Sequence, residues 1–458
     1  MKFAKSAVAV AVLTLASAAA HADSSGITDN VTQNGSYNSA SINQTNTNGD
    51  AVAISQSSAS DGTQYNFKAS VTTNNGTDDR TSITQASGWA EPYSSVTVLQ
   101  NGTSHETNTI TQSASLGGDW SANITQSADA STGNAQYDTN VINQSGYINS
   151  ASITQQGGGW NNVTINQGVS AFGSSNSATV AQTDTYANTV GIAQTGSGGT
   201  AKVQTTGDGG NNTAIAQTGG ATNAGVVQTA EAGDTVGITQ NGTAKATVNS
   251  SYGAANTTTI SQQGGVTGNT ASVVQFAALA NTAAITQTAD GNSASVNQTA
   301  VYDDHAAINQ TAAANTASIT QEFGYGDTAN IGQSAAGNHA SILQFGSVGS
   351  TAAIEQDSVG NNAGVIQNAS ASSVSVLQNG GIGNFVSASQ NGANDVLSLA
   401  QTGDENSILA TQVYGSGNDG YVTQIGAGNS VTLAQQGNGN YANIHQTGSN
   451  NSAIVNQH

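Results

Sequence analysis

The heptapeptide Asn38-Ser39-Ala40-Ser41-Ile42-Asn43-Gln44 contains the pattern that decides the fold, N-x-A-x-[IV]-x-Q. From Gln262 to Gln457 the final glutamine of this pattern recurs at intervals of mostly 11 or 12 residues. Between residues 304 and 406 the first position alternates between Asn and either Asp or Ser, so the true repeat is about 23 residues long and has two unlike halves. Further copies of the pattern lie at residues 149–155, 281–287, 315–321, 338–344 and 440–446.

A period of two indicates an extended strand, because alternate side chains of a strand point to opposite faces. Asn, Ala, Ile and Gln therefore share one face, and Gly, Asn, Asp and Ser between the strands are typical of turns. We predict an all-β fold: a β-solenoid of stacked strand-turn-strand coils, with two facing parallel sheets and about 23 residues per coil. Ile319 and Ile342 are expected inside, and the inward Asn and Gln amides are expected to bond along the stack.

The composition excludes most other classes of protein. Ile, Val, Leu and Phe make up about 17 % of the 458 residues, too few for an ordinary enzyme core. A net charge of −20 with only 6 Lys and Arg repels nucleic acid and anionic membranes, so neither is expected as a partner. The chain has no Cys, which removes disulfides, thiol nucleophiles and Cys-based zinc sites.

The first 22 residues are typical of a secretory signal peptide. Lys2 and Lys5 precede a short apolar run, and residues 20–22 fit the small-x-small cleavage rule, so we expect cleavage between Ala22 and Asp23. The mature chain, residues 23–458, is expected to be secreted and to form the solenoid without membrane insertion. Within it, residues 57–135 are expected to be irregular with longer loops, and residues 256–458 to be the most regular part.

No motif for catalysis or metal binding is apparent in the sequence. The histidines are scattered without ligand spacing, and Asp303-Asp304-His305 is interpreted as a charged, solvated turn. We therefore predict no enzyme activity, no cofactor and no metal. The acids at the turns are expected to act as gatekeepers that slow assembly through repulsion between like charges.

Two consecutive repeats carry a more specific register. In each, a serine and a glutamine six residues later precede an asparagine and a second glutamine: Ser350, Gln356, Asn361, Gln367, Ser372, Gln378, Asn384 and Gln390. This register resembles the repeat of curlins, the subunits of the extracellular bacterial amyloid fibres called curli, over nearly all of residues 23–458. The resemblance implies that these eight residues form inward ladders that promote polymerisation. It also implies a cell-surface fibre, or pilus, that supports adhesion and biofilm matrix. Its partners would be other copies of the chain, a nucleator subunit and an outer-membrane secretion channel.

A monomeric secreted solenoid that binds a surface, ice or glycans remains the alternative, while a membrane barrel would need longer strands and more aromatic residues. Monomeric solenoids carry polar caps that block pairing at their edges. Residues 451–458 instead continue the strand pattern to the last residue, and Val31 and Gln33 begin it soon after the expected cleavage site. Uncapped ends favour end-to-end stacking of copies into a filament.

Overall fold

The computed structural model describes residues 25–35, 37–58, 66–87, 93–114, 119–128, 135–146, 148–168, 175–207 and 209–458. The expected signal peptide, with Ala22 and Asp23, lies outside these residues. The chain forms two compact units, Met1–Ala230 and Glu231–His458. Within the described residues of both units the only regular elements are strands and isolated bridges, which confirms the predicted all-β class.

Unit 1 contains eight coils in its described part, and each coil contributes one long strand to each of two sheets. Strands β7 and β10 are two-residue elements at the turns. The strands of unit 1 are β1 (Thr28–Asn34), β2 (Ser39–Thr45), β3 (Ala51–Ser58), β4 (Asn66–Asn74), β5 (Arg80–Ser87), β6 (Tyr93–Asn101), β7 (Thr103–Ser104), β8 (Thr107–Ala114), β9 (Trp120–Ser127), β10 (Ala135–Gln136), β11 (Thr139–Ser145), β12 (Asn149–Gly159), β13 (Asn162–Gly168), β14 (Asn176–Tyr186), β15 (Thr189–Gln194), β16 (Thr200–Thr206), β17 (Asn212–Thr218) and β18 (Thr222–Thr229).

Unit 2 contains ten coils, again with one strand of each coil in each sheet. The strands of unit 2 are β19 (Thr235–Asn241), β20 (Ala244–Ser251), β21 (Thr257–Gln263), β22 (Asn269–Phe276), β23 (Thr282–Gln287), β24 (Ser293–Thr299), β25 (His305–Gln310), β26 (Thr316–Glu322), β27 (Thr328–Gln333), β28 (His339–Phe345), β29 (Thr351–Gln356), β30 (Asn362–Gln367), β31 (Ser373–Asn379), β32 (Phe385–Ala393), β33 (Val396–Thr402), β34 (Ser407–Ser416), β35 (Asp419–Ile425), β36 (Ser430–Gln436), β37 (Tyr441–Thr447) and β38 (Ser452–Gln457).

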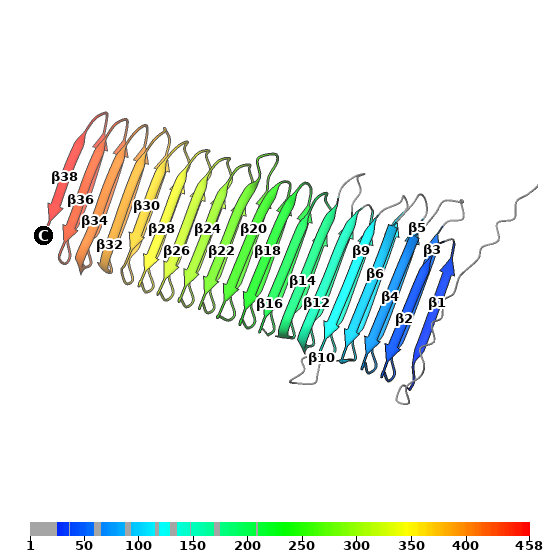
Figure 1. The fold of residues 1–458 in the computed structure, drawn as a ribbon. Helices are drawn as coiled ribbons and strands as arrows, with labels where there is room; N and C mark the ends of the chain where they lie inside the picture. Colours follow the sequence, from blue (N-terminus) through cyan, green and yellow to red (C-terminus); the bar gives the residue numbers. More distant parts are fainter. Residues whose placement is uncertain are drawn as a thin grey trace, which may run out of the picture. The chain divides into compact units, whose positions relative to one another are not determined.

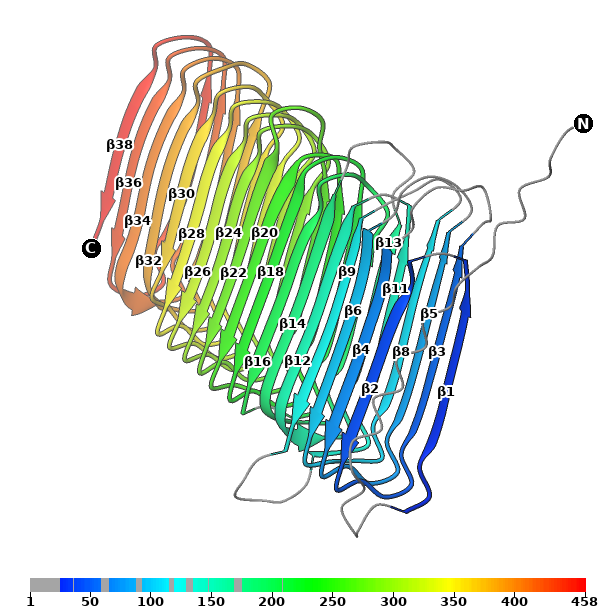
Figure 2. The ribbon, with the colours of Figure 1, turned by 45° about the vertical axis from the view of Figure 1, so that its right-hand side comes forward.

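Both sheets of each unit are parallel, and their strands pair in register apart from a shift between Asn391 and Ala393 in β32. In unit 2, β25 pairs with β27 so that Ile308 lies opposite Ile331, and β26 pairs with β28 so that Ile319 lies opposite Ile342. Figure 1 shows β20 to β38 of one sheet side by side, and Figure 2 shows the two layers of unit 1 joined by turns. This arrangement is the predicted β-solenoid with two facing parallel sheets.

The length of a coil differs between parts of the chain. In unit 2, paired glutamines such as Gln310 and Gln333 are 23 residues apart, as the sequence period predicts. In unit 1 the corresponding separations between β3, β5, β8 and β11 are 29, 27 and 32 residues. The extra residues lie between the strands, so the strands themselves keep their register.

The core is a thin layer of stacked Ile, Val and Ala between the two sheets. Ile319 and Ile342 are 0 % and 2 % exposed, and the intervening outward residues alternate with them along each strand. Burying one such aliphatic side chain contributes roughly 1.5–3 kcal/mol. Because each unit repeats this contribution in every coil, few aliphatic residues per coil suffice.

The turns use backbone conformations that favour glycine. Gly326 has φ +66°, and Asp303 holds the same place one coil earlier with φ 57°. A second row of glycines is fixed by close stacking: a Cβ on Gly403 would collide with the carbonyl oxygen of Gly426, and one on Gly426 with that of Gly448. These glycines therefore let successive turns stack at the strand spacing.

Candidate assembly site

The first ladder runs along one sheet of unit 2, which contains β19 and every second strand after it up to β37. Nε2 of Gln356 donates to Oε1 of Gln378 in the next coil (2.8 Å), and Oε1 of Gln356 accepts from Nε2 of Gln333 (2.8 Å). The second hydrogen of Gln356 Nε2 bonds the carbonyl of His339 in the facing sheet (3.1 Å). Each buried amide is thus satisfied by its neighbours, and the donors all point toward higher residue numbers.

The second sheet carries the same ladder. Gln344 donates to Gln367 (2.9 Å), which donates to Gln390 (2.9 Å), which donates to Gln412 (2.8 Å). Gln367 and Gln390 also bond carbonyls of the facing sheet, at 3.1 Å each. The ladder direction is the same in both sheets, so each coil presents donors on one side and acceptors on the other.

A separate column stands at the start of each strand. Oδ1 of Asn361 accepts the backbone N–H of Asn384 (2.9 Å), while the Asn361 amide nitrogen bonds the carbonyl of Ser358 (2.8 Å). Ser350 and Ser372 hold the equivalent place in the other sheet, where the hydroxyl oxygen of Ser372 accepts the N–H of Asp395 (3.1 Å). The predicted ladder residues therefore divide into this turn column and the glutamine ladders.

Buried acids occupy the same turn column, and the interpretation of Asp303-Asp304-His305 as a solvated turn was wrong for Asp304. Asp304, Asp327 and Asp395 are 0 % exposed. The Oδ1 of Asp304 accepts the N–H of Asp327 (2.8 Å), and that of Asp327 accepts the N–H of Ser350 (2.7 Å). A carboxylate oxygen therefore accepts the same backbone hydrogen bond from the next coil that an Asn side-chain oxygen accepts elsewhere in the column. Asp303 and His305, which lie beside Asp304, are exposed as expected.

Burial changes the titration of these acids. Removal from water raises the pKa of Asp304 to about 7, helped by the charges of Asp327 and Asp303 and opposed by the backbone N–H of Asp327. Burial also raises the pKa of Asp327 and that of Asp395. These groups take up protons more readily than exposed acids do, so they do not act as simple surface charges.

Unit 1 stacks four acids at this place in four successive coils. Asp50, Asp79, Glu106 and Asp138 are all buried. The Oδ1 atoms of Asp50 and Asp79 accept the N–H groups of Asp79 (3.1 Å) and Glu106 (3.0 Å). Burial, followed by the charges of Asp138 and Asp79, raises the pKa of Glu106. The sequence signal was available, because each acid lies six residues before a ladder glutamine.

The glutamine ladder is interrupted where a short side chain takes the glutamine place. Thr205 lies opposite Gln182, as its position in the sequence pattern indicates. Both are buried, and Nε2 of Gln182 and Oγ1 of Thr205 have no hydrogen-bond partner among the described residues. Thr73 makes a similar interruption opposite Gln44. Such gaps leave polar groups unsatisfied at a cost in stability.

The inward columns become partly exposed at the end coils. In β38, Val455 and Gln457 are half-buried, whereas their partners Leu433 and Gln435 in β36 are buried. In β2, Ile42 is likewise half-buried, although its partner Val71 is fully covered. Within the described residues, β38 pairs only with β36, and β2 only with β4.

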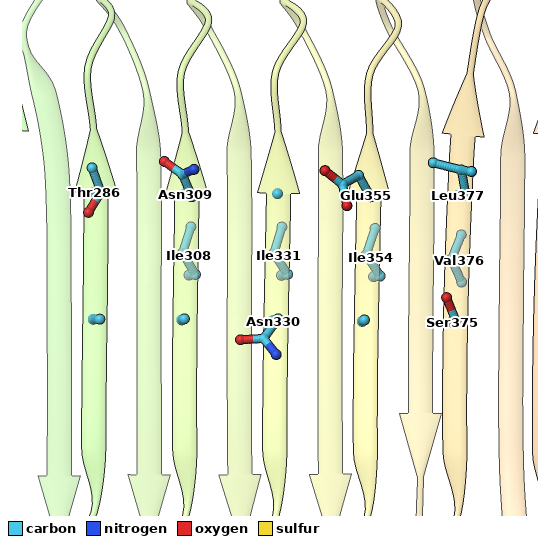
Figure 3. Close-up of a pocket in the computed structure, with 14 residues that line it drawn as sticks. Thr286, Ile308, Asn309, Asn330, Ile331, Ile354, Glu355, Ser375, Val376 and Leu377 are labelled. Carbon is cyan, nitrogen blue, oxygen red and sulfur yellow. The ribbon is translucent and has the colours of Figure 1, made fainter.

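The outer face of unit 2 has a shallow trough of about 660 Å³. Its floor is made of small residues, including Ala307, Gly332 and Ala353 on β25, β27 and β29. Figure 3 shows Asn309 and Glu355 beside this floor, with the core isoleucines behind the strands. The outward side chains in the trough differ from coil to coil, so they do not form the regular array that ice binding requires.

The described residues contain no group of three or more His, Cys, Asp and Glu placed to hold a metal ion. Nor does any helix among them reach the length and apolarity needed to cross a membrane.

The comparisons with known proteins point to one family. No curated protein was found to match the chain. The family model described as the curlin associated repeat matches residues 426–458, which contain β36, β37 and β38. The match agrees with the resemblance drawn from Ser350 to Gln390. The C-terminal part of this chain therefore carries a curlin associated repeat, built as coils of a β-solenoid.

Proposed function

We propose that the chain is a structural subunit of an extracellular, curli-like amyloid fibre that supports adhesion and biofilm matrix. Copies assemble by stacking the β1–β2 end of one molecule on the β37–β38 end of another. The curlin associated repeat in residues 426–458 supports the class of protein, which is structural rather than enzymatic. The partly exposed inward columns of the end coils carry the proposal of stacking.

The polarity of the ladders makes the two ends complementary. At the β37–β38 end, Oε1 of Gln446 and of Gln457 accepts from the preceding coil, which leaves a donor hydrogen on each Nε2 for the next coil. At the other end, Nε2 of Gln33 donates to Gln56, and Oε1 of Gln33 accepts no hydrogen bond from the residues that the structure describes, so it can accept from a donor of another copy. A donor end therefore meets an acceptor end, and copies stack head to tail with one polarity.

The spacing of the glutamines supports one register for the junction. Gln446 and Gln457 are 11 residues apart, as are Gln33 and Gln44, so both ladders continue together. Val455 then packs against Ile42 of the next copy, as Leu433 packs against Val455 within the molecule. Secretion through an outer-membrane channel and a nucleator subunit belong to the same proposal by resemblance to curlins.

Electron microscopy of the whole chain after removal of denaturant tests the proposal. Gln457→Ala removes one junction donor, and Asn456→Ala alters the neighbouring exposed residue of the same strand as a control. We expect filaments from the unaltered chain and from Asn456→Ala, with slower elongation of Gln457→Ala. A folded chain that stays monomeric would instead support the monomeric surface-binding protein. Equal elongation of both variants would contradict the stacking junction.

A further inference from the structure

Two exposed tyrosines are stacked on neighbouring coils of unit 2. Tyr302 and Tyr325 lie in the turns after β24 and β26, which pair side by side (Figure 1), and an isolated parallel bridge joins the two residues. Their ring centroids are 5.2 Å apart and the ring planes differ by 2°. The residues are 43 % and 53 % exposed, so both rings are open to a reagent in water.

Stacked phenols can couple by oxidation. Each phenol gives up one electron and its hydroxyl proton, and the two radicals then join through ring carbons next to the hydroxyls. The hydrogens on those two carbons move to the oxygens, which restores two phenols linked by a carbon–carbon bond. Overall two hydrogen atoms leave and reduce one molecule of hydrogen peroxide to two waters, with a haem peroxidase carrying the electrons.

We propose that Tyr302 and Tyr325 form an oxidative cross-linking site that joins consecutive coils when the protein meets hydrogen peroxide and a peroxidase. The in-register strands hold the rings in contact before the reaction, so that coupling needs only rotation of two exposed side chains. Leu279 and Val348, which flank the pair in the bridge column, carry no phenol that would compete. The chain has no Cys to cross-link or to consume the radicals.

Other tyrosines of unit 2 provide a comparison. The rings of Tyr421 and Tyr441 are 5.9 Å apart and tilted by 47°, so their edges are not aligned as those of Tyr302 and Tyr325 are. Tyr252 packs edge-on against Phe276, which has no hydroxyl to oxidise. The parallel pair is therefore the preferred site of coupling within the unit. Its product closes a covalent loop between two coils and should raise resistance to denaturant.

The test treats the dilute whole chain with hydrogen peroxide and a haem peroxidase. We expect dityrosine fluorescence, an intact mass lower by two hydrogen atoms, and a digest peptide pair that joins residues 302 and 325. Tyr302→Phe and Tyr325→Phe keep the stacked ring but remove the phenol, and each should lose most of the fluorescence. Tyr421→Phe is the matched control and should keep it.

Two results would overturn the proposal. One is a digest of the unaltered protein in which residues 302 and 325 are not joined, including one in which the tyrosines link only different copies. The other is a loss of fluorescence in Tyr302→Phe no larger than in Tyr421→Phe. Circular dichroism of each variant verifies that the strand content is unchanged, so that either result bears on the chemistry alone.

Discussion

Replacing Asp304 by Asn should remove the part of the pH dependence of stability that this buried carboxyl contributes. The folded state raises the pKa of Asp304 from 3.8 to about 7, because the carboxyl is buried beside Asp327 and Asp303. The folded chain therefore holds a proton that the unfolded chain releases. The contribution is fully present below about pH 4 and is lost as pH rises through about 7.

The magnitude follows from this shift. A pKa difference between 3.8 and about 7 corresponds to a contribution of at most about 4 kcal/mol to the free energy of unfolding. Water near the exposed turn residues screens the charge, so we expect roughly 2 kcal/mol of the free energy of unfolding to disappear. The amide introduced by Asp304→Asn would keep an oxygen for the N–H of Asp327, as Asn281 does for the N–H of Asp304 at 2.7 Å.

Urea unfolding of dilute protein at about pH 4 and about pH 8 measures the effect. From the lower to the higher pH, the free energy of unfolding of the unaltered chain should fall by roughly 2 kcal/mol more than that of Asp304→Asn. Asp357→Asn is the control, because Asp357 is exposed and its carboxylate accepts a hydrogen bond from the Ser334 hydroxyl at the surface. If Asp304→Asn keeps the full pH dependence of the unaltered chain, the burial of this carboxyl is refuted.

Three further changes test other parts of the structure. Asp29 takes the inward place of an alanine at the β1 edge, and partial burial raises its pKa. Asp29→Ala removes this carboxyl from the proposed junction and should speed fibre elongation at neutral pH; equal growth of variant and unaltered chain would count against the junction. Gly426→Ala combines φ +115° with a collision at Gly448 and should cost roughly 1–3 kcal/mol in urea unfolding. Gly237→Ala, whose Cβ would meet open space, should cost almost nothing, and an equal cost would contradict the stacked turns. Thr205→Gln should fill the gap beside Gln182 and raise the free energy of unfolding by about 1 kcal/mol, whereas a loss would mean that the site has no room.

The repeat period made the main features of the fold predictable. A spacing of two placed Ile319 and Ile342 inside, and a spacing of 23 placed each glutamine beside the next. These features follow from the geometry of strands alone, which does not depend on the residues in the turns. The same arithmetic would have brought Tyr302 beside Tyr325, since they too are one coil apart.

The usual preference of carboxylates for water argued against the burial of the acids, although their position six residues before a ladder glutamine indicated it. Asp304 and Asp327 hold a place where the turn supplies a backbone N–H from the next coil, and this bond exists only in the stacked structure. The left-handed backbone of Ala280, with φ 58°, is a similar case, because alanine rarely signals such a turn. In both, contacts between coils override the local preference of the residue.

A disulfide placed across the proposed junction tests the central claim most directly. Asn43 and Asn456 are exposed, outward residues next to Gln44 and Gln457, and in-register stacking would bring them into adjacent strands of two copies. Strands about 4.8 Å apart bring the two Cα atoms within disulfide range. After oxidation, fibres carrying both Asn43→Cys and Asn456→Cys should give a ladder of covalent multimers linked between residues 43 and 456. The out-of-register pair Ser41→Cys with Asn456→Cys should give few. Equal cross-linking by the two pairs, or fibres without any 43–456 link, would contradict head-to-tail stacking of the solenoid ends.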